Sequence, residues 1–174
     1  MAVLTILKVP HPFLKKKVKK VQEITPEVLR ILDDIAETMY YSNGIGLAAS
    51  QVGIDMRLVT IDVSTEERKS ELLKLINPEI IEGEGELIME EGCLSVPEIR
   101  DEVKRYKKIK AKYLDINGEE RIIEDDGLIA RVIQHEIDHL DGIVFLDRLS
   151  PLKKALYYRR LKKEAKKRKN ELRM

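Results

Sequence analysis

Residues 126–140 read DGLIARVIQHEIDHL and form the most informative stretch of the chain. Their apolar residues recur at helical spacing, and Gly142 follows as a stop signal. In such a helix His135 and His139 lie one turn apart and differ by only about 40° in direction, so both rings can reach one metal ion. Glu136 is rotated by about 100° from His135 and can reach a water on that metal. The segment therefore predicts a metal centre on a largely apolar helix.

The region before this helix has the composition and alternation of β-strands. We expect strands in residues 57–63, 72–77, 79–89 and 107–114. Asn117-Gly118 separates residues 107–116 from 119–124, which is a strong signal for a hairpin. Because the strands cluster between helical segments, we expect an α+β fold in which mostly antiparallel strands surround the central metal-binding helix.

Two further helices flank the strand region. The first begins after Thr25, which is followed by Pro26 and Glu27, and it should end near Gly44. The second begins at Ser150-Pro151 and continues to about residue 172. From Lys153 onward the chain holds eleven basic and two acidic residues, a net charge of +9, which leaves −8 on the remainder because the whole chain is +1. We therefore divide the chain into a body, residues 1–150, and a basic helix, residues 151–174, as part of the same domain or as an appendage.

The composition excludes several classes of protein. With 174 residues, 43% of them hydrophobic, the chain can form one domain with a substantial core. The net charge of +1 argues against a globally basic nucleic-acid binder, including a DNA-binding protein. A single cysteine cannot form an internal disulfide and fits a reducing compartment. No apolar run is long enough to span a membrane, so we expect a cytoplasmic protein with no membrane partner.

A catalytic metal site needs a third protein ligand besides His135 and His139. His11 is the only other histidine, and its place between two prolines is typical of a turn or packing residue. Cys93 is the better candidate, because its neighbours in EEGCLS, residues 90–95, are polar or glycine rather than an apolar run. Asp138 is interpreted as a structural charge and not as a ligand. One cysteine and two histidines with an open fourth position would form a hydrolytic metal centre.

A third motif is GIGLAASQ, residues 44–51. It matches the G-x-G-x-x-A pattern of dinucleotide-binding proteins, but that pattern needs a preceding strand and a following helix. Here a helix precedes it and a strand follows at about Arg57, so we reject the nucleotide interpretation. The small residues indicate either close approach by a ligand or a tight connection between helix and strand.

Taken together, GIGLAASQ, EGCLS and HEIDH closely resemble the three signature motifs of the peptide deformylase family, in the family's order and with similar separations. The resemblance covers nearly the whole chain. It implies a metal-dependent hydrolase that removes the formyl group from the N-terminal formylmethionine of nascent polypeptides and releases formate. It also implies that residues 1–150 are the catalytic domain.

The resemblance assigns roles to individual residues. Cys93, His135 and His139 would hold one divalent metal, Fe²⁺ by family resemblance, although the donor set also suits Zn²⁺, Ni²⁺ or Co²⁺. Glu136 would move protons, while the Gln51 amide and the Leu94 backbone N–H would stabilise the oxyanion. Residues near the methionine and the peptide would include Ile45, Gly46, Glu91, Leu128 and Val132.

Some of these assignments have alternatives. Ile45, Leu128 and Val132 could be ordinary core residues. Glu91 and Arg100 could form a pair that supports the site or faces the substrate, or simply a solvated ion pair. The basic C-terminal helix either is simply solvated or binds ribosomal RNA near the emerging peptide.

Two other functions deserve comparison with the deformylase. A general HExxH metallopeptidase would place its third ligand downstream of the helix, where this chain has no further histidine. A structural zinc module would need a fourth cysteine or histidine, and only His11 is left for that position.

Overall fold

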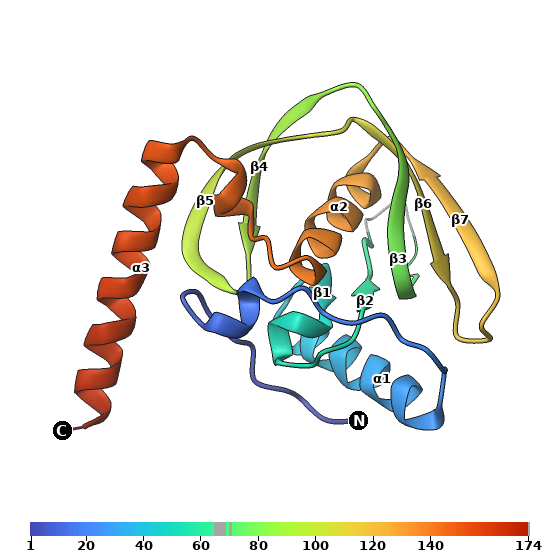
Figure 1. Ribbon diagram of the computed structural model, residues 1–174, viewed down its shortest axis with the longest axis horizontal. Helices are drawn as coiled ribbons and strands as arrows, with labels where there is room; N and C mark the ends of the chain where they lie inside the picture. The colour runs from blue at the N-terminus through green and yellow to red at the C-terminus, as the bar shows by residue number, and fades with distance from the viewer. Residues whose placement is uncertain (65–68, 70, 174) are drawn as a thin grey trace.

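The fold is described by a computed structural model that covers residues 1–64, 69 and 71–173 (Figure 1). Helix α2 (Leu128–Leu140) lies at the centre of the molecule and is flanked by two antiparallel sheets (Figure 1). The larger sheet has the order β1-β2-β3-β6-β7, with β1 (Gly46–Ala48), β2 (Leu58–Ile61), β3 (Leu73–Glu84), β6 (Lys108–Leu114) and β7 (Glu120–Asp125). The smaller sheet pairs β4 (Leu87–Cys93) with β5 (Val96–Arg105). The expected α+β class is confirmed.

The other two helices begin at the capping residues predicted from the sequence. In α1 (Pro26–Tyr41) the Thr25 side chain accepts a hydrogen bond from the backbone N–H of Val28. In α3 (Pro151–Leu172) the Ser150 side chain accepts one from the backbone N–H of Lys153. Both helices also have proline in the first turn, where its missing N–H costs nothing. Three short 3₁₀ helices complete the described elements: η1 (Pro12–Lys15), η2 (Ala49–Val52) and η3 (Phe145–Arg148).

Helix α2 is enclosed so completely that every residue from Ile129 to Leu140 is buried. Its apolar residues, such as Ile133, pack with β2, β3 and β6 in one core cluster. Such burial excludes water from polar side chains on the helix and strengthens their electrostatic interactions. The helix is therefore a rigid, water-poor support for the histidines predicted to bind metal.

The strand prediction needs two corrections. The expected strand over residues 79–89 is two strands, because β3 continues through Asn77-Pro78 to Glu84 and the chain then reverses at Gly85, which has a φ of 68°. Proline is tolerated in β3 because the pairing with β6 shifts register at this point. Strands β1 and β5 are both absent from the prediction. Glu98 has a φ of 63°, so the buried positions of β5 do not follow a simple alternation.

The hairpin prediction is confirmed. Strands β6 and β7 pair in an antiparallel manner, and the backbone N–H of Asp115 donates to the carbonyl of Glu119 across the turn. Gly118 in this turn has a φ of 79°, a conformation that suits glycine.

The first half of α3 packs against the body, whereas the second half extends beyond it (Figure 1). Leu161 is buried in a cluster with Val103 and Phe145. The hydroxyls of Tyr157 and Tyr158 donate to the carboxylates of Asp101 and Asp147 at 2.8 and 2.9 Å. Every described residue after Ala165 is exposed. Within the described residues, no helix is long and apolar enough to cross a membrane.

Candidate active site

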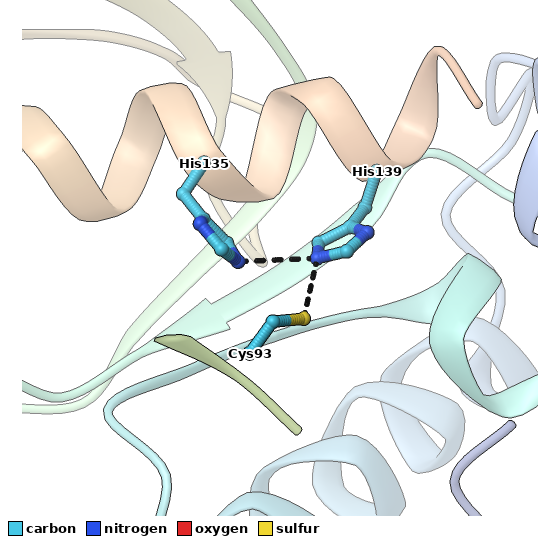
Figure 2. Close-up of side chains that lie close together, drawn as sticks. All are labelled: Cys93, His135 and His139. Carbon is cyan, nitrogen blue, oxygen red and sulfur yellow. Dashed lines mark hydrogen bonds between the residues drawn. The ribbon is translucent and has the colours of Figure 1, made fainter. Parts of the chain in front are cut away.

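The three predicted metal ligands converge in the structure (Figure 2). His135 and His139 point from α2 toward Cys93, which lies at the end of β4. The Nε2 atom of His139 is 3.2 Å from the Cys93 Sγ and 3.2 Å from the His135 Nε2. All three ligand atoms lie within 4.8 Å of one another. One thiolate and two imidazoles arranged in this way form a donor set for a divalent transition metal.

The hydrogen bonds around these residues fit a metal ion. Nδ1 of His135 is 2.9 Å from a carboxylate oxygen of Glu91, so Nδ1 carries the proton and Nε2 presents its lone pair to the centre. Nε2 of His139 and the Cys93 sulfur face the same point. Three electron-pair donors so close together repel one another unless a cation lies among them. The residues present therefore match the requirements of a metal centre.

The two histidines differ in their electrostatic surroundings. Burial alone would lower the pKa of His135, but the adjacent Cys93 and Glu91 outweigh it and raise this pKa to about 10. Burial and the neighbouring His135 hold the pKa of His139 well below its ordinary value. The anions around His135 thus favour a positive charge on or beside its ring, whether this is a proton or a metal ion.

Glu91 connects His135 to two buried arginines. Its carboxylate accepts hydrogen bonds from Arg105 at 2.6 and 2.9 Å and from Arg131 at 2.7 Å. Burial would raise the pKa of Glu91, but the hydrogen bonds from His135 and Arg105 lower it to about 2. Glu91 is therefore a permanent anion that fixes the orientation of His135.

The pair that the sequence suggested as one possibility, Glu91 with Arg100, does not form among the described residues. Arg100 instead donates to Glu90 at 2.7 Å, and both side chains are exposed. Successive residues of a strand point to opposite faces, so Glu90 faces solvent where Glu91 faces the interior. Which of two adjacent glutamates points inward depends on strand register, which the sequence does not specify.

Asp138 is a structural charge, as expected. It accepts hydrogen bonds from Arg105 at 2.9 Å and from Arg148 at 2.5 and 2.7 Å. Arg105 thereby links Asp138 to Glu91 on the other side of its guanidinium group. His11 also has a structural role, because its Nδ1 accepts a hydrogen bond from the backbone N–H of Phe13 at the start of η1.

Glu136 is buried beside the cluster of Cys93, His135 and His139. Within the part of the chain that the structure describes, its Oε2 atom has no hydrogen-bond partner. Burial raises the pKa of this carboxyl group to about 7. A carboxyl group with such a pKa can both accept and donate a proton near neutral pH, as general acid–base catalysis requires.

Glycine is required at position 46 by the close approach of α2. A Cβ atom placed there would lie 2.7 Å from the Val132 Cγ1 and 2.8 Å from the Glu136 Oε1. Strand β1 pairs with β2 through Gly46 and Ile61, and its other side is an edge of the sheet. An extended peptide can hydrogen-bond to such an edge.

Gln51 is held beside Cys93 by several contacts. Its side-chain oxygen accepts a hydrogen bond from the backbone N–H of Ala48 at 3.0 Å, which directs the amide nitrogen toward Ser95 Oγ and Cys93 Sγ, at 3.1 and 3.5 Å. The motif over residues 44–51 contains the short strand β1 and the 3₁₀ helix η2. This local structure has no crossover helix, in agreement with the rejection of a nucleotide site.

An open cavity of about 380 Å³ lies in front of the site. Its walls include all the residues predicted to contact substrate or stabilise an oxyanion: Ile45, Gly46, Gln51, Glu91, Leu94, Leu128 and Val132. Cys93, His135 and Glu136 also line it, whereas His139 is buried behind them. Arg100, considered as a substrate-facing residue, also lines the cavity. The prediction missed further lining residues, namely Asn43, Gly44, Met89, Glu90, Gly92 and Arg131. Met89, Glu90 and Gly92 are sequence neighbours of Glu91 and Cys93. Their position at the cavity could therefore have been predicted from these two residues.

Comparison with known proteins gives consistent matches. The family model for polypeptide deformylase matches residues 3–155. A peptide deformylase from Thermodesulfovibrio yellowstonii is 49% identical over 162 residues, covering 93% of this chain and 98% of that protein. One from Thermoanaerobacter pseudethanolicus is 51% identical over 148 residues, covering 85% and 90%.

Solved structures agree with these sequence matches. A peptide deformylase from Legionella pneumophila has a TM-score of 0.87 and 40% identity, covering 96% of this chain and 98% of that one. A peptide deformylase from Ehrlichia chaffeensis in complex with actinonin has a TM-score of 0.88 and 39% identity, covering 94% and 98%.

Proposed function

Because this chain belongs to the peptide deformylase family, whose metal-dependent members remove the N-formyl group from nascent peptides, we propose that Cys93, His135 and His139 hold its metal. The observation that carries this proposal is the convergence of the three ligand atoms within 4.8 Å of one another. We propose one ion per chain, Fe²⁺ in the cell, with Zn²⁺, Ni²⁺ or Co²⁺ as substitutes, because thiolate and imidazole ligands suit all four.

Glu136 is proposed to transfer the protons of the reaction. A bound metal would supply Lewis-acid activation of a water molecule and of the formyl oxygen. Glu136 takes a proton from the attacking water and later gives it to the amine of the departing peptide. Its burial beside the ligands and its pKa of about 7 support both transfers.

Two donors are proposed to stabilise the oxyanion that forms when water adds to the formyl carbon. The Gln51 amide nitrogen is held beside Cys93, and the backbone N–H of Leu94 directly follows this ligand in the chain. Each such donor typically contributes about 3 kcal/mol to the stabilisation of the transition state.

The substrate is proposed to bind as an extended strand along the edge of β1, with Gly46 as its hydrogen-bonding partner. Ile45, Leu128 and Val132 form apolar walls for the methionine side chain, supported by their position in the cavity. Glu91 also lines the cavity, but His135, Arg105 and Arg131 already occupy its oxygens. We therefore assign Glu91 to positioning His135 and not to direct contact with substrate.

The body and the C-terminal helix are proposed to have separate roles. Residues 1–150 form the catalytic domain, and the helix over 151–174 binds the ribosome through its basic distal half. This would place the enzyme in the cytoplasm, where nascent peptides emerge. The net charge of +9 from Lys153 onward and the exposure of every described residue after Ala165 support contact with RNA phosphates.

Ligand substitutions test the proposed metal centre. Cys93→Ser replaces an anionic, polarisable ligand with a neutral hydroxyl, so we expect less than 0.1 metal per chain after dialysis against a mild chelator, on the order of tenfold or more below the parent. His11→Asn is the matched control, because His11 lies outside the site and asparagine can also cap η1. Metal analysis is paired with hydrolysis of formyl-Met-Ala. Retention of one metal by Cys93→Ser would contradict the ligand assignment.

A further inference from the structure

A second cavity, of about 310 Å³, lies against another face of α2. It is lined by Gly85, Lys104, Tyr106, Gln134, Asp138 and Arg148, among others, and shares no lining residue with the cavity at the metal centre. Arg105, which holds Glu91, is the one lining residue with a place in the reaction described above. We propose that this cavity binds a small oxyanion, a carboxylate or a phosphate.

The walls of the cavity are fixed by hydrogen bonds. The side-chain amide of Gln134 accepts from the backbone N–H of Tyr106 and donates to its carbonyl, both at 3.0 Å, and also donates to the Ala130 carbonyl. The Tyr106 ring lies over Gly83, where a Cβ atom would be only 2.6 Å from it. A cavity with such fixed walls needs little ordering when a ligand enters.

The charges around the cavity have an excess of one positive charge. The lining contains three basic residues, Lys104, Arg105 and Arg148, and two acidic residues, Glu86 and Asp138. The buried acid, Asp138, is already neutralised by both arginines, and Glu86 pairs with Lys104 at 2.9 Å. Glu91 and Arg131 continue this network of ion pairs. They add one charge of each sign, so the excess of one positive charge is unchanged. The local field therefore favours an anion.

The hydrogen-bonding groups that remain available are donors. Arg148 uses its Nε and one Nη group on Asp138, and its Nη1 group donates to nothing in the described part of the chain. Lys104 has three donors, of which the Glu86 contact needs one. The side chains of Arg148 and Lys104 are 42% and 59% exposed, so a ligand can reach both. Guanidinium and ammonium groups together select an oxygen-rich anion.

Nuclear magnetic resonance on the Zn²⁺-loaded protein tests this site directly. Acetate and inorganic phosphate are titrated separately at constant ionic strength, adjusted with chloride. We expect a saturable, one-site change in the Tyr106 backbone amide and the Gln134 side-chain amide. The Gly46 amide reports any separate binding at the metal centre. A response to acetate alone identifies a carboxylate site, one to phosphate alone identifies a phosphate site, and a response to both supports a general oxyanion site.

Variants separate this site from surface charge. Arg148→Gln and Lys104→Ala should each weaken binding by about tenfold or more. Arg121→Ala, at an exposed arginine paired with Asp115 on the distant hairpin, should bind as the parent does. Lys104 is exposed, so its variant remains informative even if Arg148→Gln destabilises the fold. Changes that do not saturate, that appear only at Gly46, or that persist in Lys104→Ala would overturn the proposal.

Discussion

At the scale of single residues, the site depends on close contacts that leave no spare volume. A Cβ at position 46 would lie within 2.8 Å of side-chain atoms of Val132 and Glu136, so one carbon atom added there must displace them, including the side chain proposed to move protons. Glu91 in turn holds His135 by its Nδ1 atom. Positioning of this kind accounts for large losses of activity from displacements of about 1 Å.

We predict that Gly46→Ala lowers kcat/KM for formyl-Met-Ala by about 100-fold or more while the protein stays folded, because the new Cβ displaces the Glu136 carboxylate. Steady-state kinetics and a thermal melt measure the two effects. The control is Gly127→Ala, where a Cβ would meet only the end of the Asp125 side chain at 3.6 Å. Near-normal kcat/KM in Gly46→Ala would show that the contact with Glu136 is not needed for catalysis.

At the scale of elements, α3 is attached to the body by a carboxylate as well as by apolar packing. Asp101 on β5 accepts hydrogen bonds from Tyr157 at 2.8 Å and Lys153 at 3.1 Å, both on α3. These bonds lower the pKa of Asp101 below its ordinary value. The contact therefore stabilises the fold fully above the unfolded-state pKa of about 3.9 and loses this effect as the pH falls through the lower native pKa.

We predict that Tyr157→Phe reduces the free energy of unfolding by about 1 kcal/mol at pH 7 and by less at pH 3, since below about pH 3.9 the unfolded chain takes up the Asp101 proton and the contact stabilises the fold less. Urea unfolding at both pH values measures the difference. Tyr41→Phe, at a tyrosine that is 74% exposed, serves as the control. An effect of Tyr157→Phe that is equal at the two pH values would contradict the role of the Asp101 charge.

Truncation separates the two halves of α3. A chain that ends at Ala165 keeps the buried Leu161 and loses five basic residues and one acidic residue. We expect it to hydrolyse formyl-Met-Ala at nearly the parental rate but to co-sediment less with ribosomes at low salt. A chain that ends at Ser150 should be less stable, because burial of a leucine alone contributes about 1.5–3 kcal/mol. Equal co-sedimentation of the Ala165 truncation and the full chain would reject the ribosome proposal.

At the scale of the whole molecule, the sequence predicts local structure better than contacts between distant segments. Helices α1 and α3 follow from their capping residues, and α2 follows from its apolar spacing. The proposed metal ligands follow from His135, His139 and the setting of Cys93. Strand β5 was missed because Glu98 breaks the alternation.

The network of buried charges around α2 is a second example of contacts that the sequence does not predict. It joins Glu91, Arg105, Arg131, Asp138 and Arg148, which come from β4, β5, α2 and η3. Only the register of the strands and the packing of α2 bring these side chains together, so no local pattern indicates their pairing.

The central claim is that one metal held by Cys93, His135 and His139 works with Glu136 to release formate. The direct measurement is an anaerobic titration of the metal-free protein with Fe²⁺, in which formate released from formyl-Met-Ala and bound metal are followed together. We predict that activity rises linearly and stops at one ion per chain, and that Glu136→Gln binds the same single ion but turns over about 10²–10⁴-fold more slowly. Formate release without metal, or near-parental turnover by Glu136→Gln, would contradict the account.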